Sequence, residues 1–262
     1  MAFTLDSIIT GRDNKPPRIV FYAVSGFGKT TFASQAPNPI FIQTEEGIGN
    51  LEYARFPVAK KYSDVVDALI LLSENCTFSS VVIDTIDALE RLIFDEVVRL
   101  HNEEGKKQVT SIGDIPFGGG YTKALSLWGE ILRALDYIRD AGVMPILLAH
   151  SQIKTFTPPD SEGYDRYRFN MHDKASELVK DWCDIVLFGN YKTYTKGAED
   201  EKKRGVGTGQ RYIYTQERPA HWGKNRYSLP YEISFDDGKQ WSTFADLMWP
   251  KKDNKVTKEE AF

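Results

Sequence analysis

The 262-residue chain has little cysteine, no excess of basic residues and no long hydrophobic run. Its two cysteines, Cys76 and Cys183, lie far apart and lack the close spacing of metal ligands, so we expect two buried free thiols in a reducing compartment. No stretch approaches the roughly 18 apolar residues of a membrane span, and the N-terminus lacks the basic region of a secretory signal. We therefore expect a cytoplasmic protein without a membrane partner.

The formal net charge of −4 argues against a whole-molecule positive field of the kind that drives tight, passive DNA binding. Any contact with nucleic acid must then come from local loops. With 41% hydrophobic and 27% charged residues, the chain can build one substantial core. We predict a lead-in over residues 1–16, one domain over 17–250 that is β-rich from about 185, and a flexible tail over 251–262.

The most informative segment is an apolar run that leads into a glycine-rich loop. Residues 18–22 read RIVFY and residues 23–30 read AVSGFGKT. A triphosphate needs several backbone N–H groups converging on its oxygens, and only glycines let the chain wrap that closely. The pattern predicts a phosphate-binding loop (P-loop) followed by a helix whose first N–H groups face the phosphates. The predicted nucleotide-binding residues are Ser25, Gly26, Phe27, Gly28, Lys29, Thr30 and Thr31.

Within this loop, Lys29 is expected to reach the β- and γ-phosphates, and the Thr30 hydroxyl is expected to bind Mg²⁺, which prefers oxygen ligands. Ala23 stands where the motif usually has its first glycine, so the turn that enters the loop must tolerate a Cβ atom. The alternative is a chance Gly-Lys-Thr in a turn. The apolar strand before it and the helix after it favour the P-loop.

Apolar patterning after the loop predicts strands that alternate with helices. Apolar runs predict buried strands at 39–42, 80–85 and 143–149, and helical spacing of apolar residues predicts helices at 63–74, 86–100 and 125–138. Such alternation is typical of a parallel sheet. After residue 184, short β-rich segments around the Lys- and Gly-rich stretch 196–209 predict an antiparallel extension with a mobile loop.

Polar residues at the ends of these strands are the candidates for chemistry. Asp84 ends a buried strand, where a P-loop enzyme places the carboxylate that holds magnesium directly or through water. The alternative is that Asp84 or Thr85 caps the next helix. Glu45 and Glu46 follow the strand at 39–42, where a carboxylate can orient the attacking water, although a solvated acidic turn fits the residues equally well.

Two further pairs of residues are candidates. His150 and Gln152 lie at the end of the strand predicted at 143–149, where either side chain can sense the γ-phosphate; a satisfied polar strand end is the alternative. Lys224 and Arg226 are two residues apart and share one side of an extended segment. Such a pair can reach a triphosphate on a neighbouring subunit, or can simply be solvated on a surface strand.

The order of these motifs resembles a RecA-like ATPase core, and more closely the bacteriophage RecA-like ATP-binding proteins of the Sak single-strand annealing group. The resemblance spans roughly residues 17–230. It implies a RecA-like P-loop NTPase fold, with a mostly parallel sheet flanked by helices and a C-terminal antiparallel β extension, and it implies ATP and Mg²⁺ as cofactors. By this resemblance Glu45 activates the water, Asp84 is the Walker B carboxylate and Gln152, ahead of His150, senses the γ-phosphate.

The same resemblance implies partners. Lys224 and Arg226 are similar to a finger inserted into the adjacent subunit's site, which implies a homo-oligomer with nucleotide at its interfaces. Segments 117–121 and 153–170 correspond to two DNA-facing loops. The second mixes cations with aromatic residues, as single-strand binding requires, although acidic residues dilute its charge and a disordered surface loop is the alternative. The residues concerned are Lys154, Arg166 and Arg168, interleaved with Phe156, Tyr164, Tyr167 and Phe169.

We therefore predict a Mg²⁺-dependent ATPase that binds single-stranded DNA and serves phage recombination or replication. One alternative is a nucleotide-gated adaptor that loads or regulates another replication protein, which would keep Lys29 and Asp84 but not need Glu45. The other is a small-molecule kinase, which normally carries an arginine-bearing lid; within the region 191–210, Lys196, Lys202, Lys203 and Arg204 lie in what we expect to be a polar hairpin loop.

Overall fold

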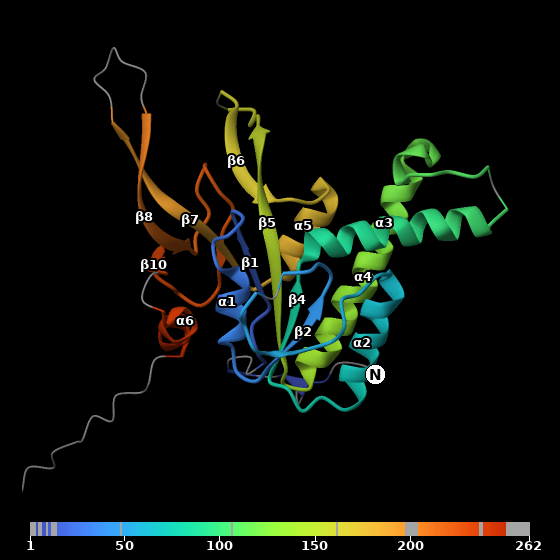
Figure 1. Ribbon diagram of the computed structural model, residues 1–262, viewed down its shortest axis with the longest axis horizontal. Helices are drawn as coiled ribbons and strands as arrows, with labels where there is room; N and C mark the ends of the chain where they lie inside the picture. The colour runs from blue at the N-terminus through green and yellow to red at the C-terminus, as the bar shows by residue number, and fades with distance from the viewer. Residues whose placement is uncertain are drawn as a thin grey trace, which may run out of the picture.

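The computed structural model describes residues 4, 7–8, 10–11, 15–47, 49–105, 107–160, 162–196, 204–235 and 238–249. A ten-stranded sheet forms the centre of this part of the chain, in the order β10-β8-β7-β1-β5-β4-β2-β3, with β6 paired to β5 and β9 to β7 (Figure 1). Strands β7, β1, β5, β4, β2 and β3 run parallel to their neighbours, whereas β6, β8, β9 and β10 pair antiparallel. The predicted parallel sheet with a C-terminal antiparallel extension is confirmed.

The strands are β1 Ile19–Ala23, β2 Pro39–Gln43, β3 Ala54–Arg55, β4 Ser80–Asp84, β5 Met144–Phe156, β6 Tyr164–Phe169, β7 Ile185–Lys196, β8 Arg204–Tyr214, β9 Lys224–Asn225 and β10 Glu232–Ser234. The helices are α1 Lys29–Ser34, α2 Tyr62–Glu74, α3 Ile86–Glu103, α4 Gly119–Asp140, α5 Asp173–Trp182 and α6 Gln240–Met248, with two 3₁₀ turns, η2 Ile112–Asp114 and η3 Pro116–Gly118. None of the described helices is both long and apolar enough to cross a bilayer.

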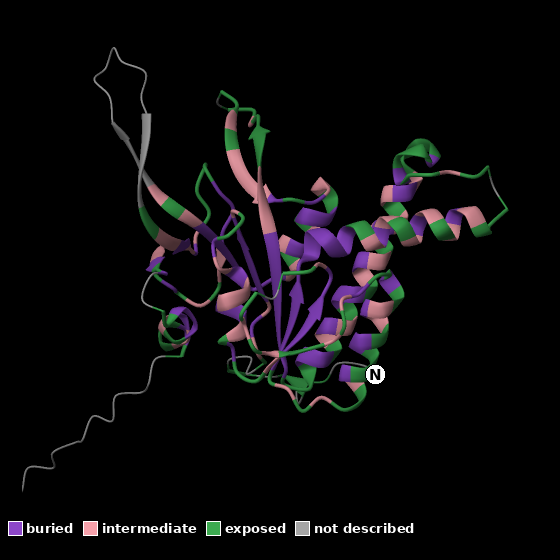
Figure 2. Cartoon of the chain, viewed as in Figure 1, coloured by how far each residue is buried: buried purple, intermediate pink, exposed green. Residues whose placement is uncertain are grey.

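The central strands are buried on both faces, because helices cover each side of the sheet (Figure 2). Along β1, Val20 and Tyr22 join a core built with α2, α3, α4 and α5, while Ile19, Phe21 and Ala23 join a second core with α1 and α6. This division follows from the alternation of side chains along a strand. A parallel strand covered on both faces needs apolar residues at every position, which is why the sequence shows continuous apolar runs.

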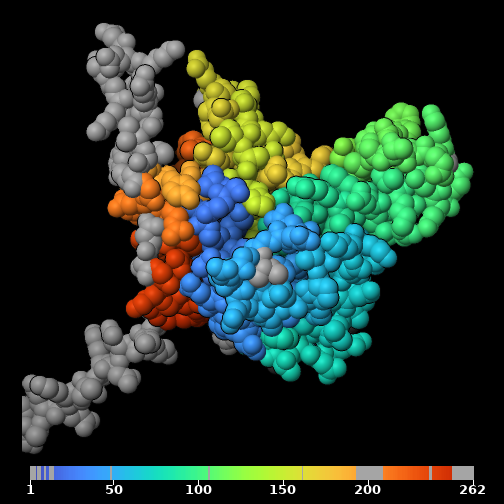
Figure 3. Space-filling view, viewed as in Figure 1, coloured from blue at the N-terminus to red at the C-terminus, as the bar shows by residue number. Residues whose placement is uncertain are grey.

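The β5–β6 hairpin projects from this body, as does an arm formed by the end of α3, η2, η3 and the start of α4 (Figure 3). The hairpin replaces the loop expected over 153–170, since β5 runs on to Phe156 and pairs with β6 from Ser151↔Phe169 to Phe156↔Tyr164. The disordered alternative is therefore wrong for the described residues. Alternating aromatic and charged side chains suit such a two-stranded ribbon, because cross-strand pairs stabilise it.

The remaining expectations concern the loop at 196–209, the two ends of the chain and the two cysteines. Part of the loop expected over 196–209 is strand, since Lys196 ends β7 and Arg204 begins β8, while residues 197–203 lie outside the described chain. The same is true of the tail at 251–262 and of most of the lead-in. Both cysteines are free; Cys183 is buried as expected, whereas Cys76 is only half-buried because it lies in the turn between α2 and β4.

Candidate active site

The register of the sheet brings the predicted site residues to one edge. Ala23, the last residue of β1, pairs with His150 of β5, and Gln43, the last residue of β2, pairs with Asp84 of β4. Asp84 in turn lies opposite Leu148 of β5. The carboxyl ends of β1, β2 and β4 therefore meet beside the middle of β5, at the edge where open α/β sheets bind their ligands.

The P-loop connects β1 to α1 at this edge. Gly26 and Gly28 have φ angles of 72° and 112°, a backbone conformation that a Cβ atom disfavours, so the loop needs glycine at both positions. Ala23 is still part of β1 and is not among the described residues with positive φ. This explains why alanine is tolerated where the motif usually has its first glycine.

Phe27 anchors the loop to the core and does not face the cleft. Its ring is fully buried and packs edge-on against Phe21, with the ring centroids 5.8 Å apart. Gly189 of β7 leaves room for this ring, because a Cβ atom there would lie 2.6 Å from Phe27 Cε1. From β8, Arg211 Nη1 donates a hydrogen bond to the Phe27 carbonyl at 2.9 Å. These contacts hold the turn of the loop from its core side.

A cleft of about 350 Å³ opens between the P-loop and the ends of β2, β4 and β5. Gly28 precedes α1 and provides no side-chain cap, so the first-turn N–H groups stay open to a ligand. Ser25, Phe27, Gln152, Lys224 and Arg226 are not among the residues that line it. The lining residues are Gly26, Gly28, Lys29, Thr30, Thr31, Gln43, Glu45, Glu46, Gly47, Leu51, Asp84, Thr85 and His150.

The two predicted magnesium ligands touch each other. Thr30 Oγ1 donates a hydrogen bond to Asp84 Oδ2 at 2.9 Å, so two oxygen donors from different elements converge. Beside them, Gln43 Oε1 is buried without a hydrogen-bond partner among the described residues. A hydrated Mg²⁺ fits this set, because it takes oxygen ligands and its waters can satisfy such an acceptor. No described cluster of three or more His, Cys, Asp or Glu residues is able to hold a metal alone, so the remaining ligands must be phosphates and water.

Burial shapes the charges around this pair. Lys29 is 7% exposed, and desolvation lowers its pKa despite the nearby charges of Asp84, Asp87 and Glu45. Burial also raises the pKa of Asp84, partly offset by the hydrogen bond from Thr30. Each shift reflects a buried charge that a bound Mg²⁺–triphosphate would stabilise, since phosphate oxygens pair with the ammonium and the cation pairs with the carboxylate.

Glu45 and Glu46 both line the cleft, but their surroundings differ. Glu46 is exposed, whereas Glu45 is half-buried and places Oε1 3.9 Å from His150 Nδ1. Thr44 fixes the backbone before them, because its N–H donates to the Asp84 carbonyl at 2.9 Å and its hydroxyl donates to the Thr85 carbonyl at 2.6 Å. Sequence reasoning missed Thr44, whose role depends on the pairing of β2 with β4.

His150 and Gln152 point to different places. His150 lines the cleft, with its backbone N–H and Nδ1 each 2.9 Å from a carboxylate oxygen of Asp87. Gln152 Nε2 instead donates to the carbonyls of Phe169 and Met171, at 2.8 and 3.2 Å. The structure therefore brings His150, and not Gln152, to the P-loop. Asp87 was missed; its position in the first turn after Thr85 was the available signal.

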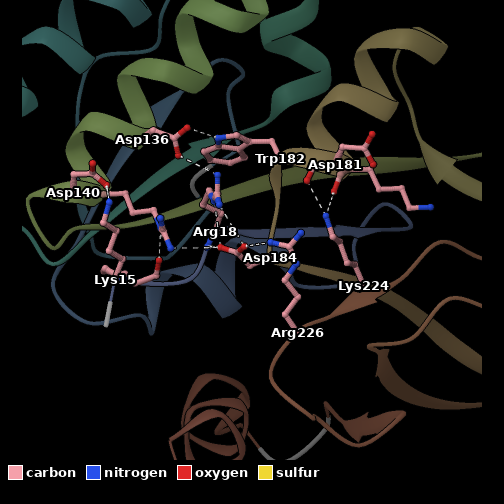
Figure 4. Close-up of polar contacts among 12 residues, drawn as sticks. Lys15, Arg18, Asp136, Asp140, Asp181, Trp182, Asp184, Lys224 and Arg226 are labelled. Carbon is pink, nitrogen blue, oxygen red and sulfur yellow. Dashed lines mark hydrogen bonds and ion pairs between the residues drawn. The ribbon is translucent and has the colours of Figure 1, made fainter. Parts of the chain in front are cut away.

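Lys224 and Arg226 lie at the opposite edge of the sheet. β9 pairs with Ile185 and Val186, the first residues of β7, whereas the P-loop follows the last residue of the parallel strand β1. Lys224 Nζ donates to the carbonyls of Lys180 and Asp181 at the end of α5 (Figure 4).

Arg226 Nη1 donates to Asp184 Oδ1 at 2.9 Å. Asp184 also accepts from Arg18 (Figure 4). Arg139 Nη2 lies 3.8 Å from the same carboxylate. Burial opposes ionisation of Asp184, but the hydrogen bonds and charges of Arg18 and Arg139 hold its pKa below the usual range. Asp184 thus ties the start of β1 and the segment after β9 together. The side chain of Arg226 remains 56% exposed.

The cations of the β5–β6 hairpin are all paired within the chain. Lys154 contacts Asp173, Arg166 lies 3.1 Å from Glu217, and Arg168 lies 3.4 Å from Asp173. Among the aromatic residues of this hairpin, Phe169 is fully buried. Phe156 is 40% exposed, and Phe117 on the arm is fully exposed.

Comparison with known proteins gives the family. Residues 15–227, most of the chain, match the family model described as an AAA domain. No curated protein gives a significant match. Among solved structures, the chain is similar to the KaiC-like protein PH0186 from the hyperthermophilic archaeon Pyrococcus horikoshii OT3, with a TM-score of 0.42 and 12% identity over 85% of this chain and 86% of that one. The predicted P-loop α/β fold, with a mostly parallel sheet and an antiparallel extension, is confirmed, and the protein belongs to the AAA domain family of P-loop ATPases.

Proposed function

We propose that this protein is a Mg²⁺-dependent ATPase that couples ATP hydrolysis to single-stranded DNA, as a RecA-like annealing or recombination protein in phage recombination or replication. The observation that carries the proposal is the convergence of Lys29, the Thr30–Asp84 pair and Glu45 in one cleft. A phosphate cradle, two magnesium ligands and a carboxylate for the attacking water are the parts that phosphoryl transfer to water needs.

Each residue has a separate task in this proposal. The open N–H groups of the P-loop bind the phosphates and Lys29 neutralises their charge. Thr30 and Asp84 would hold Mg²⁺, which supplies charge stabilisation for the transferring phosphoryl group. Glu45, held by the fixed backbone of Thr44, orients a water molecule for attack.

Strand β5 supports the coupling to DNA. Its first half carries His150 into the cleft and its second half forms the projecting hairpin, so one rigid element joins the two regions. Ile153 and Phe156 are exposed on this hairpin, and Phe117 is exposed on the arm. Exposed aromatic rings suit base stacking, which binds single strands without reading their sequence.

The test is phosphate release from ATP and Mg²⁺, titrated with single-stranded DNA. We expect DNA to raise the rate, and Lys29→Ala to abolish it, because the phosphate charge loses its buried partner. Lys174→Ala, at an exposed position on α5, is the matched control and should leave the rate unchanged. Absence of ATP binding and hydrolysis, or unchanged activity of Lys29→Ala, would refute the ATPase. A rate indifferent to DNA would refute the coupling.

One observation favours a second candidate, the nucleotide-gated adaptor. Lys154, Arg166 and Arg168 are all neutralised by carboxylates of the chain, which leaves little free positive charge for phosphate contacts. An adaptor would bind ATP and a protein partner without needing turnover. Glu45→Gln separates the two functions, because it should stop hydrolysis by an ATPase but leave the nucleotide-dependent switching of an adaptor intact.

A further inference from the structure

Asp87 holds His150 by two hydrogen-bonding groups at once. Its Oδ1 accepts the backbone N–H of His150 at 2.9 Å, and its Oδ2 lies 2.9 Å from the ring atom Nδ1. The Asp87 side chain is only 1% exposed, whereas that of His150 is 29% exposed and borders the cleft. A buried carboxylate on α3 therefore fixes both the backbone and the ring of a cleft residue on β5.

The direction of the ring contact follows from the charge of Asp87. Burial opposes ionisation of this carboxyl group, but the hydrogen bonds from the ring and the backbone of His150 hold its pKa below the usual range. An ionised carboxylate only accepts hydrogen bonds, so Nδ1 must carry the proton and donate it. The other ring nitrogen, Nε2, has no hydrogen-bond partner within the described part of the chain.

We propose that Asp87 is a positioning residue that fixes the rotamer and tautomer of His150, so that Nε2 alone is presented to the terminal phosphate or its attacking water. In the neutral ring, Nε2 accepts a hydrogen bond from water; in the protonated ring, it donates one to a phosphate oxygen. The assignment of a phosphate or its attacking water as the partner of Nε2 rests on the proposed ATPase function. The predicted tautomer of His150 does not depend on that function.

A purely structural role for Asp87 would be simpler. An acidic residue in the first turn of α3 is stabilised by the helix dipole, and Thr85 already caps this helix through its hydroxyl, which accepts from the Ala88 N–H at 3.4 Å. Neither effect requires contact with the imidazole ring. The second carboxylate oxygen of Asp87 contacts Nδ1 of His150, and this contact indicates that Asp87 controls the orientation of the ring.

Asp87→Asn tests the proposal because asparagine has nearly the same shape as aspartate but reverses the direction of the hydrogen bond to Nδ1 of His150. The amide oxygen still accepts the His150 backbone N–H, but the amide NH₂ donates to Nδ1 and forces the proton onto Nε2. In ¹⁵N NMR of the histidines, with His150→Gln identifying the signal, we expect protonated Nδ1 in the wild type and protonated Nε2 in Asp87→Asn. We expect kcat to fall about tenfold or more and the KM for ATP to change less than about twofold.

Two controls test whether the effect of Asp87→Asn acts through His150. Asp95→Asn, at an exposed position on the same helix, should change neither the tautomer nor kcat. In a His150→Gln background, Asp87→Asn should have almost no further effect on kcat, because the two residues act as one unit. An Nε2–H tautomer in the wild type, or an undiminished effect of Asp87→Asn without His150, would overturn the proposal. A wild type that lacks ATPase activity but has the expected tautomer would instead refute the proposed function alone.

Discussion

Glu90 is a buried carboxyl group one helical turn beyond Asp87 on α3. Its Oε2 accepts the backbone N–H of His172 at 2.9 Å, while Oε1 is buried with no hydrogen-bond partner among the described residues. Burial, reinforced by the charge of Asp87, raises the pKa of Glu90 to about 7. The ring of His172 stacks on Tyr121 at the start of α4, with centroids 4.4 Å apart. Glu90 thus joins α3 to the junction of α4 and α5.

This residue makes stability depend on pH in an unusual direction for a carboxyl group. The folded pKa lies above the ordinary value of 4.5, so between these values the folded state keeps a proton that the unfolded chain has released. Stability should therefore fall as pH rises from about 4.5 to 7. We expect Glu90→Gln to remove this loss and to gain on the order of 2–3 kcal/mol over the wild type at pH 8, with little difference near pH 4.5.

Urea unfolding of both proteins at several pH values measures the effect, and only the difference between them is interpreted, since other groups titrate in both. Asp95→Asn on the exposed face of α3 should follow the wild-type curve. Parallel curves for wild type and Glu90→Gln would contradict the prediction, because they would show that Glu90 titrates alike in the folded and unfolded chains.

The sequence was sufficient for residues whose chemistry is local. Gly26, Gly28 and Lys29 form a contiguous motif, and their loop conformation follows from it. Asp87 and His150 are 63 positions apart, and only the placement of α3 beside β5 makes them partners. Spacing along the chain cannot reveal such a pair. For the same reason the sequence could not distinguish His150 from Gln152, which share a face in an extended strand.

At the level of elements, β5 shows why the end of a strand was harder to predict than the presence of the strand. Its apolar first half predicted a buried strand, but the polar half from Ser151 to Phe156 continues as strand because β6 pairs with it. Gln152 belongs to this second half, and its amide is held by the carbonyls of Phe169, the last residue of β6, and of Met171. α5 and α6 were not predicted, since each is short and depends on packing against the sheet.

Gly189 of β7 supports the P-loop, because it leaves room for the ring of Phe27. This contact leads to a prediction about how one strand affects the loop. A Cβ atom at position 189 would lie 2.6 Å from the ring of Phe27 and 2.9 Å from that of Phe21. We expect Gly189→Ala to displace Phe27, to lower stability by about 1–3 kcal/mol and to raise the KM for ATP several-fold, because the loop turns at Phe27.

Gly129→Ala is the matched control, on α4 far from the loop. A Cβ atom there meets only the flexible end of Arg133, so the helix should gain up to about 1 kcal/mol. Thermal unfolding and ATP titration distinguish the two variants. If Gly189→Ala behaves like Gly129→Ala, Phe27 has room to move and the loop does not depend on β7.

At the scale of the whole molecule, the two ends of the parallel strands have opposite character. The carboxyl edge holds the cleft, and the amino edge holds Lys224 and Arg226 beside Asp184 (Figure 4). The strand β1 that separates these edges has five residues, a length of on the order of 15 Å. Lys224 and Arg226 therefore do not reach their own cleft, and a catalytic role for them requires a neighbouring subunit that packs edge to edge.

Mixing two inactive variants tests this arrangement. Arg226→Ala keeps an intact cleft and Lys29→Ala keeps an intact Arg226, so each should be inactive alone. In a mixed head-to-tail oligomer at equal amounts, about a quarter of the interfaces combine the intact parts, and activity should return to about that fraction of the wild type. Because Arg226 is largely exposed, losing its ion pair with Asp184 should cost at most about 1 kcal/mol, so Arg226→Ala should remain folded.

The mixture has to be compared with each variant at the same total concentration, since dilution alone changes the degree of assembly. Recovery that rises and then falls with the mixing ratio, with its maximum at equal amounts, is specific to a site shared between subunits. An Arg226→Ala protein that is fully active alone would place the residue outside catalysis, with its contact to Asp184 serving the fold. A mixture that stays inactive although both variants assemble would mean that Arg226 acts within its own subunit, which the sheet geometry does not allow without a large rearrangement of β9.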